Sequence, residues 1–160
     1  MARSSEPCSQ RWSTTTSSWT TSSARRQRPE WAREECHVWS TLAIATGGAL
    51  GSVARYGVTR LAMEWAGSGT WGTFAVNVTG SLLLGLIVGL SDERIAMHPV
   101  LRNGLTVGVM GGYTTFSTLM LDSARQLGTG SALAAVANIG GSILVGLAAM
   151  LLGLLIGRSA

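Results

Sequence analysis

The sequence predicts an all-α membrane protein with four transmembrane helices, and three observations lead to this fold class. Hydrophobic residues make up 46% of the 160 residues and charged residues only 12%, which is about half of the usual charged fraction of a soluble domain. Four long stretches carry no charge, and short connections separate them. Small residues recur at four-residue spacing inside these stretches, as they do where membrane helices pack closely.

The first 39 residues differ from the rest of the chain. They are rich in Ser, Thr and Arg, and they hold six of the twelve arginines and four of the eight acids. Such a segment cannot bury a core, so we expect residues 1–39 to form a low-complexity, disordered tail. A second hypothesis is that translation starts at Val38, since no Met lies between Met1 and Met63. Under either hypothesis, residues 40–158 are expected to form the membrane domain.

The uncharged stretches run over residues 38–54, 65–91, 103–121 and 126–157. Each approaches or exceeds the roughly 20 residues that a bilayer core requires, although the first reaches that length only by including Arg55 or by tilting. Short connections favour packing of neighbouring helices against each other. We therefore expect four helices in one compact bundle.

Rows of small residues predict how these helices associate. Lipid is as apolar as a leucine side chain, so close backbone packing has to hold membrane helices together. Four helices offer little interior of their own, and we expect an oligomer, with a dimer as the simplest case. The rows are Gly47 and Gly51; Ser81, Gly85 and Gly89; Gly104, Gly108 and Gly112; Ser142 and Gly146; and Gly153 and Gly157.

The distribution of arginines bears on orientation in the membrane. An even number of spans places both termini on one side. Beyond the tail, three arginines fall on that side and two on the other, which decides nothing. If the tail is translated, its arginines place both termini in the cytoplasm. We expect a multi-pass protein of the cell membrane.

Several function classes are excluded by what the chain lacks. The membrane domain carries six arginines and four carboxylates, too few for a groove that binds nucleic acid. It shows no nucleophile beside a base, no metal-ligand cluster and no phosphate-binding loop, so we expect no enzymatic activity. We expect Glu64 and Asp122 at helix ends, so no carboxylate lies deep in a span. This argues against a proton-coupled exporter of cationic drugs, which needs a membrane-embedded acid.

Polar residues inside the spans are the candidates for function. Thr73, Asn77 and Ser81 line one face of the second span. Asn77 is the most informative, because the two donors of a primary amide cannot be satisfied within its own helix. Its side chain therefore bonds across to another helix or faces a conduit.

Three further positions extend this set. Arg55 in the first span must reach the interface or pair with a carbonyl or an anion. Asn138 and Ser142 repeat the four-residue spacing in the fourth span, although the Ser142 hydroxyl could bond to the carbonyl one turn back. The stretch MGGYTTFSTLM, residues 110–120, places two glycines and four serine and threonine hydroxyls in the third span. Hydrogen-bond donors without acids suit an anion.

Three segments occur together in this chain: GGALGSVARYGVTRL (47–61), GTFAVNVTGSLLLG (72–85) and GVMGGYTTFSTL (108–119). They resemble the CrcB-type fluoride channels, the Fluc family, in order and in separation. The resemblance covers roughly residues 42–157. The tail has no counterpart in it.

The resemblance implies an antiparallel, dual-topology-type dimer of four-helix subunits in which the third helix is broken. Two pores along the dimer interface would export fluoride from the cytoplasm by passive diffusion. A structural Na⁺ that is not transported would lie at the dimer centre. The backbone carbonyls of Gly111 and Thr114 would hold it, with the break at Gly111 and Gly112.

The same resemblance implies the residues of the fluoride pore. Fluoride is strongly hydrated, so a conduit must replace its water with hydrogen-bond donors. The edge of a phenylalanine ring is positive and can also face an anion. The residues are Arg55, Asn77, Phe116, Ser117, Thr118 and Ser142.

Two departures from the family pattern leave alternatives open. Leu119 stands where a second pore phenylalanine is expected, and Asn138 stands where a tyrosine is expected. Both fit a non-conducting or half-degenerate subunit of a heterodimeric fluoride channel. A homodimer with an altered pore is the other reading, and a small proton-coupled exporter is a third, more distant one.

Overall fold

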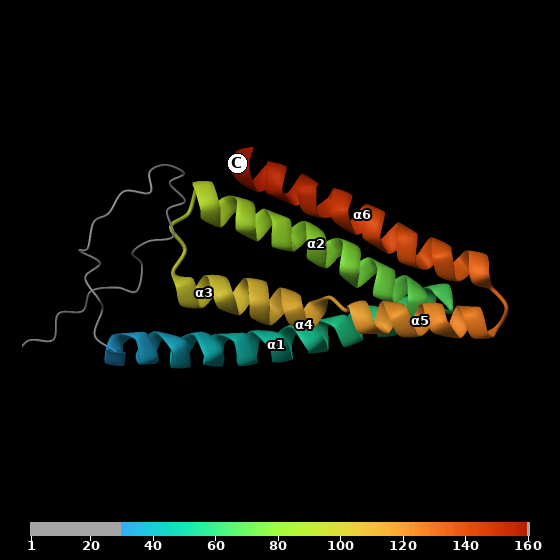
Figure 1. The fold of residues 1–160 in the computed structure, drawn as a ribbon, viewed down its shortest axis with the longest axis horizontal. Helices are drawn as coiled ribbons and strands as arrows, with labels where there is room; N and C mark the ends of the chain where they lie inside the picture. Colours follow the sequence, from blue (N-terminus) through green and yellow to red (C-terminus); the bar gives the residue numbers. More distant parts are fainter. Residues whose placement is uncertain (1–29, 160) are drawn as a thin grey trace, which may run out of the picture.

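The computed structural model describes residues 30–159, and it describes side chains from His37 onward. Within this part of the chain all regular structure is helical (Figure 1). Three helices are long and continuous, and the third span is divided into shorter segments. The long helices are α1 (Glu30–Ala66), α2 (Gly69–Glu93) and α6 (Ala132–Ser159); the segments are α3 (Pro99–Asn103), the π-helix η1 (Gly104–Met110), α4 (Gly111–Tyr113) and α5 (Phe116–Gly128).

The prediction of an all-α chain with four helices, the third broken, is confirmed. The first helix begins at Glu30 rather than near Val38, so its start lies inside the segment expected to be a tail. The remainder of that expected tail, residues 1–29, lies outside the described residues.

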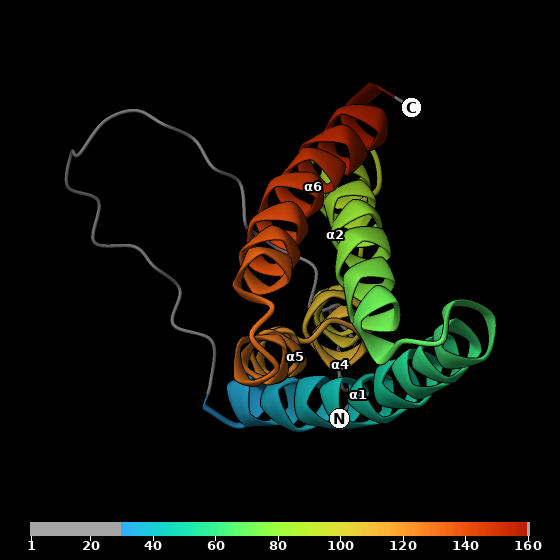
Figure 2. The same ribbon diagram turned by 90° about the vertical axis from the view of Figure 1, so that its right-hand side faces the viewer.

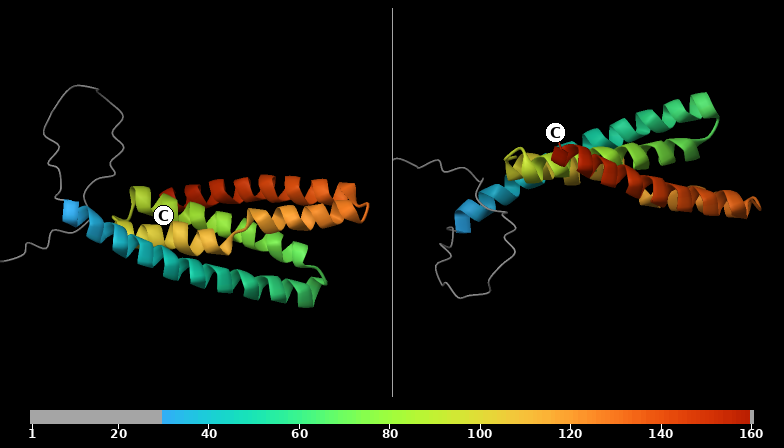
Figure 3. Two further views of the ribbon diagram at one scale, coloured as in Figure 1. Left: turned by 60° about the horizontal axis from the view of Figure 1, so that its bottom comes forward. Right: turned by 90° about the horizontal axis from the view of Figure 1, so that it is seen from above.

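Successive spans run in opposite directions along the long axis of the molecule. The start of α1, the α2–α3 connection and the end of α6 lie at one end, and the α1–α2 and α5–α6 turns lie at the other (Figure 1). Helices α2 and α6 pack against each other, and α1 packs along η1 and α4 (Figure 2). The two turns at the far end stand apart from each other (Figure 3). Because the number of spans is even, the start of α1 and the end of α6 lie at the same end of the bundle.

Local signals in the sequence explain where the helices begin and end. Gly67 adopts φ +66° between α1 and α2, a backbone conformation that favours glycine. The Ser68 hydroxyl then accepts a hydrogen bond from the Thr70 N–H, with 3.3 Å between the two atoms, and caps α2. Pro99 opens α3, where a missing N–H costs nothing. Gly130, at φ +78°, lies in the turn before α6.

The rows of small residues bring helix backbones into direct contact, as predicted. A Cβ added at Gly47 would lie 2.5 Å from the Gly104 carbonyl oxygen, and one at Gly112 would lie 2.5 Å from that of Gly48. Between α2 and α6, a Cβ at Gly157 would lie 2.6 Å from the Leu86 carbonyl oxygen. Any side chain at these positions would force the helices apart, so the glycines set the interhelical distances.

The surface of the described chain is apolar and its interior is small. Only four hydrophobic side chains are buried in it, whereas large hydrophobic side chains are exposed on every long helix. Of the described helices, α2 and α6 are long and apolar enough to span a membrane. The apolar stretch of α1 is diluted by Gly, Ser, Thr and Arg55, and the third span is divided into short segments. This surface suits a lipid environment and contact with other membrane helices.

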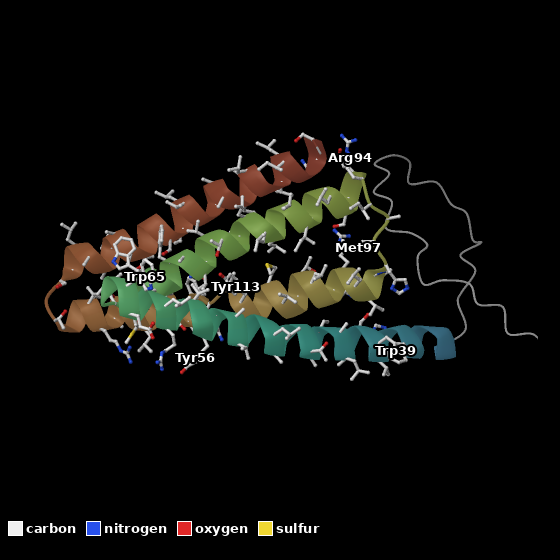
Figure 4. The ribbon with its side chains drawn as sticks, turned by 180° about the vertical axis from the view of Figure 1, so that it is seen from behind. Trp39, Tyr56, Trp65, Arg94, Met97 and Tyr113 are labelled. Atoms are coloured by element: carbon white, nitrogen blue, oxygen red, sulfur yellow. The ribbon has the colours of Figure 1, made fainter. Side chains whose placement is uncertain are left out.

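Aromatic and charged residues mark the two ends of the bundle. Trp39 and Trp65 are exposed toward opposite ends of α1, and Arg94 lies on the Trp39 side of the bundle (Figure 4). At a helical rise of ~1.5 Å per residue the two tryptophans are about 39 Å apart along α1, close to the ~40–45 Å of a bilayer with its headgroups. Ion pairs lie at both ends, namely Arg102–Asp92 and Arg158–Glu93 at one and Arg60–Glu64 and Arg125–Asp122 toward the other.

We expect Gly51→Ala to destabilise the folded chain, because its Cβ would meet the Val109 carbonyl oxygen and the Tyr113 nitrogen of the neighbouring segment. Overpacking of this kind costs roughly 1–3 kcal/mol. Thermal unfolding of the purified protein in detergent measures the effect. Gly57→Ala on the same helix is the control, since a Cβ there meets nothing within 4 Å. Equal stability of the two variants would contradict the packing role of Gly51.

Candidate functional site

The helix of the third span is interrupted at Thr114 and Thr115. Thr114 has φ −81° and ψ 156°, and Thr115 has φ −152° and ψ 113°, so both residues are extended between α4 and α5. The expected break at Gly111 and Gly112 is wrong by one turn, since both glycines remain helical. The physical reason is that Gly112 serves to bring this helix against the backbone of Gly48.

Asn77 of α2 holds the interrupted backbone from the side. Its Oδ1 accepts a hydrogen bond from the Thr115 N–H at 2.7 Å, and its Nδ2 donates to the Thr115 carbonyl oxygen at 3.0 Å. Thr115 is 7% exposed, and a buried peptide group without partners would be costly, most of all in a membrane. One primary amide thus satisfies both polar groups of the extended residue. Of the two readings of Asn77, bonding across to another helix is observed within the subunit.

The Thr115 side chain starts the next helix. Its Oγ1 accepts a hydrogen bond from the Thr118 N–H at 3.3 Å, which makes Thr115 the N-cap of α5. The same oxygen lies 3.0 Å from Thr118 Oγ1 and 3.3 Å from Ser117 Oγ. Three hydroxyls are therefore gathered at the first turn of α5, beside the amide of Asn77.

Arg55 reaches the break from α1. Its Nη1 lies 3.5 Å from the Thr114 carbonyl oxygen, and the contact is partly buried. The sequence left two options for this arginine, an interfacial position or pairing with a carbonyl or anion, and the structure shows the carbonyl. Three elements, α1, α2 and the third span, thus converge on residues 114–118 and bring together Arg55, Asn77, Thr114, Ser117 and Thr118.

The carbonyls of Gly111 and Thr114 lie on the two sides of this break. In a continuous helix they would accept from the N–H groups of Thr115 and Thr118. Those two N–H groups instead donate to Asn77 Oδ1 and Thr115 Oγ1. Gly111 is also exposed, with open space around it. Carbonyl oxygens are the hard ligands that a cation such as Na⁺ prefers. The Gly111 carbonyl has lost its helical donor and fits the expected structural ion, whereas the Thr114 carbonyl oxygen also faces Arg55 Nη1 at 3.5 Å.

The remaining expected pore residues are placed separately. Phe116 is 65% exposed on α5, and Ser117 beside it is also exposed. Ser142 on α6 is buried, and its Oγ has no hydrogen-bond partner within the described chain. The option that Ser142 bonds to its own helix is therefore not realised. Hydrogen bonds do not join Phe116 or Ser142 to the cluster at the break.

Sequence reasoning missed a second polar contact, between α2 and α5. Thr73 Oγ1 donates to Asp122 Oδ2 at 2.8 Å, and the Arg125 guanidinium lies 3.9 Å from the other carboxylate oxygen. The expectation that Asp122 lies at a helix end is wrong, because α5 continues to Gly128. The side chain is only 12% exposed. The spacing of Asp122 and Arg125, one helical turn apart, could have indicated that the helix goes on.

Both departures from the family pattern have partners inside the subunit. Asn138 Nδ2 on α6 donates to Ser123 Oγ on α5 at 3.0 Å. Leu119 is 3% exposed and belongs to the small buried core. The π-helix η1, which precedes the break, was also not foreseen; its glycines Gly104 and Gly108 lie against α1, and π segments are frequent near functional sites.

The fold and this site together define a small helical membrane protein with a polar site at a helix break and no catalytic pair within it. The family described as "CrcB-like protein, Camphor Resistance (CrcB)" matches residues 42–154. The chain belongs to this family, which confirms the resemblance seen in the sequence. The family is one of membrane channels and not of enzymes.

Relatives similar to this chain carry the name "Fluoride-specific ion channel FluC". One from Nitratidesulfovibrio vulgaris is 47% identical over 116 residues, which cover 72% of this chain and 94% of the relative. One from Nitrobacter winogradskyi is 45% identical over 118 residues, covering 73% and 94%. One from Maridesulfovibrio salexigens is 42% identical over 118 residues, with the same coverage. The similarity therefore spans nearly the whole length of each relative.

We expect Thr115→Ala to destabilise the chain by about 0.5–2 kcal/mol, the usual cost of a lost N-cap, because α5 would lose the acceptor for the Thr118 N–H. Thr115→Ser keeps the hydroxyl and should remain near the stability of the wild type. Thermal unfolding in detergent compares the two. Similar losses in both variants would show that the methyl group and not the cap matters.

Proposed function

We propose that this chain is a subunit of a fluoride-specific ion channel that lets fluoride leave the cytoplasm by passive diffusion and so lowers its toxicity. The observation that carries the proposal is the helix break, where an arginine, an amide and three hydroxyls gather without a carboxylate among them. The names of the related proteins support fluoride as the permeant ion.

The chemistry of the break suits a small, strongly hydrated anion. Such an ion enters a conduit only where donors replace its water. Asn77 uses one Nδ2 hydrogen on the Thr115 carbonyl and keeps the second. The Arg55 guanidinium has further N–H groups beyond the one that faces Thr114. Ser117 and Thr118 add hydroxyls next to the amide, so the proposed path has donors of several kinds in one place.

Two more side chains extend this proposed path away from the break. Phe116 projects from the subunit surface, where the positive edge of its ring can face an anion. The Ser142 hydroxyl is buried and without a partner in the described chain. A buried donor that its own subunit leaves unpaired is costly unless an ion, water or another chain pairs with it. This supports Ser142 as a pore residue.

A structural Na⁺ is part of the proposal. The Gly111 and Thr114 carbonyls would hold it, and the ion would stabilise the break and not be transported. One subunit supplies two such carbonyls, whereas a hard cation takes more oxygen ligands than that. A second copy of the same residues would complete the site. The positive charge would also favour an anion nearby.

A dimer of antiparallel subunits agrees with the surface of the chain. A Cβ added at Gly111, Gly140 or Gly141 would meet nothing within 4 Å, although glycine in a helix costs roughly 0.5–1 kcal/mol relative to alanine. Their presence is understandable if another chain approaches there. Outside the tail, three arginines at one end against two at the other give little preference for one orientation, so both orientations are accessible in the cell membrane. Tail arginines would fix both termini in the cytoplasm.

The partner in this dimer is a second copy or a related subunit. The contacts of Asn138 and Leu119 inside the subunit support the second option, in which this chain is non-conducting or half-degenerate and completes the pore of its partner. A proton-coupled exporter is less well supported, because Asp122, the acid inside α5, is already engaged by Thr73 and Arg125.

Fluoride efflux from liposomes that contain this chain alone, recorded with a fluoride electrode, tests the function. We expect passive efflux that does not respond to a pH gradient. Activity that appears only after co-reconstitution with a related subunit would identify the heterodimer. Absence of fluoride efflux in both cases would contradict the proposal, and transport driven by a pH gradient would favour the exporter.

We expect Asn77→Asp to lower the fluoride efflux rate by about tenfold or more, the factor that corresponds to ~1.4 kcal/mol. A carboxylate withdraws the amide donors and repels the anion. Ser81→Ala, one turn further along α2, is the matched control, since the Ser81 hydroxyl donates to the Asn77 carbonyl oxygen of its own helix at 2.7 Å. The control should retain the wild-type rate. Undiminished efflux in Asn77→Asp would remove Asn77 from the pore.

A further inference from the structure

We infer that Asn77 is a positioning residue of the cation site, separately from any donor role toward the anion: its Oδ1 takes the Thr115 N–H and thereby frees the Gly111 carbonyl. This inference rests on the Na⁺ site proposed above. It assigns the two ends of one amide to two different tasks.

The backbone hydrogen bonds of α4 show where the helical pattern ends. Thr114 N–H donates to the Met110 carbonyl oxygen at 3.0 Å, so the helical pattern is intact up to this residue. The next N–H in the series belongs to Thr115 and would donate to the Gly111 carbonyl. It donates to Asn77 Oδ1 at 2.7 Å instead. The helical series therefore ends where Asn77 provides a competing acceptor.

The other end of the amide holds the same peptide in place. Asn77 Nδ2 donates to the Thr115 carbonyl oxygen at 3.0 Å, and Thr115 is buried. Two bonds from one planar amide fix the orientation of this residue with respect to α2. Helix α2 is itself packed backbone to backbone on α6 through Gly85 and Gly153. Asn77 therefore fixes the position of the break relative to a rigid pair of helices. The position of the Gly111 carbonyl thus depends on a residue that does not touch the ion.

Substitutions at Asn77 separate the two tasks. Asn77→Ala and Asn77→Leu remove the acceptor, so the Thr115 N–H is released to return to the Gly111 carbonyl. Asn77→Asp keeps an oxygen at the Oδ1 position, loses the Nδ2 bond to the Thr115 carbonyl oxygen and adds a negative charge, so it tests whether the acceptor alone is sufficient to keep the Gly111 carbonyl free. The expectation is that Asn77→Asp loses fluoride efflux and keeps the cation site, whereas Asn77→Ala and Asn77→Leu lose both. Leucine fills the space of the amide, which guards against a variant that fails only because of a cavity.

The measurement is the melting temperature of the purified chain as Na⁺ replaces K⁺ at constant ionic strength, without fluoride. A ligand that binds the folded state raises stability with its concentration, so the Na⁺ midpoint of this rise reports the site. We expect Asn77→Ala and Asn77→Leu to raise that midpoint by about 10–100-fold, the usual effect of losing a group that orients a metal ligand. Asn77→Asp should not raise the midpoint.

Asn138→Ala is the control for general destabilisation. It removes the bond from Asn138 to Ser123, the other amide contact between spans, and should lower the melting temperature without moving the Na⁺ midpoint. A wild-type chain that does not distinguish Na⁺ from K⁺ would overturn the Na⁺ site itself. A Na⁺ response in the wild type that Asn77→Ala and Asn77→Leu retain would overturn only the inference about Asn77. Loss of the response in Asn77→Asp would show that the Oδ1 acceptor alone does not keep the cation site, and it would overturn the role given to Oδ1.

Discussion

The paired hydrogen bonds between the Asn77 amide and the Thr115 peptide are the interaction on which the functional part of the structure depends. In a bilayer, a helix can be interrupted only where other groups satisfy the freed backbone. Asn77 satisfies both polar groups of one residue, and Thr115 Oγ1 caps the helix that follows. Without these hydrogen bonds the third span would be more stable as a continuous helix. Its carbonyls would then be paired within the helix, and α5 would have no first turn to present its hydroxyls.

The glycine rows make this arrangement rigid, since they bring α1 against the third span and α2 against α6 at backbone distance. Close packing replaces the large apolar core that a soluble domain would have, and it leaves an apolar surface for lipid and for another chain. The same constraint leaves a subunit of four helices with little interior. Phe116 and Gly111 lie exposed at its surface, while Thr115 at the break is buried.

Much of the fold could be predicted from the sequence, because uncharged length and small-residue spacing are direct consequences of the membrane. The site was only partly predictable. Asn77 was recognisable as an amide that its own helix cannot satisfy, but the sequence could not say which peptide it would bind. Glycine was taken as the helix breaker, whereas Gly112 is a packing residue and the break lies at Thr114 and Thr115. The contact of Asp122 with Thr73 and the π-helix before the break depend on neighbouring helices, which no local pattern reveals.

Solid-state NMR of the protein in bilayers, with nitrogen-15 in the asparagine side chains and carbon-13 in the threonine carbonyls, tests the central claim most directly. We predict a short-range contact between Asn77 Nδ2 and the Thr115 carbonyl carbon, together with extended-backbone chemical shifts for Thr114 and Thr115. Asn77→Ala provides the assignment control for the asparagine signal. Helical shifts at both threonines, with no contact to Asn77, would contradict the claim, because the third span would then be continuous and its carbonyls already paired.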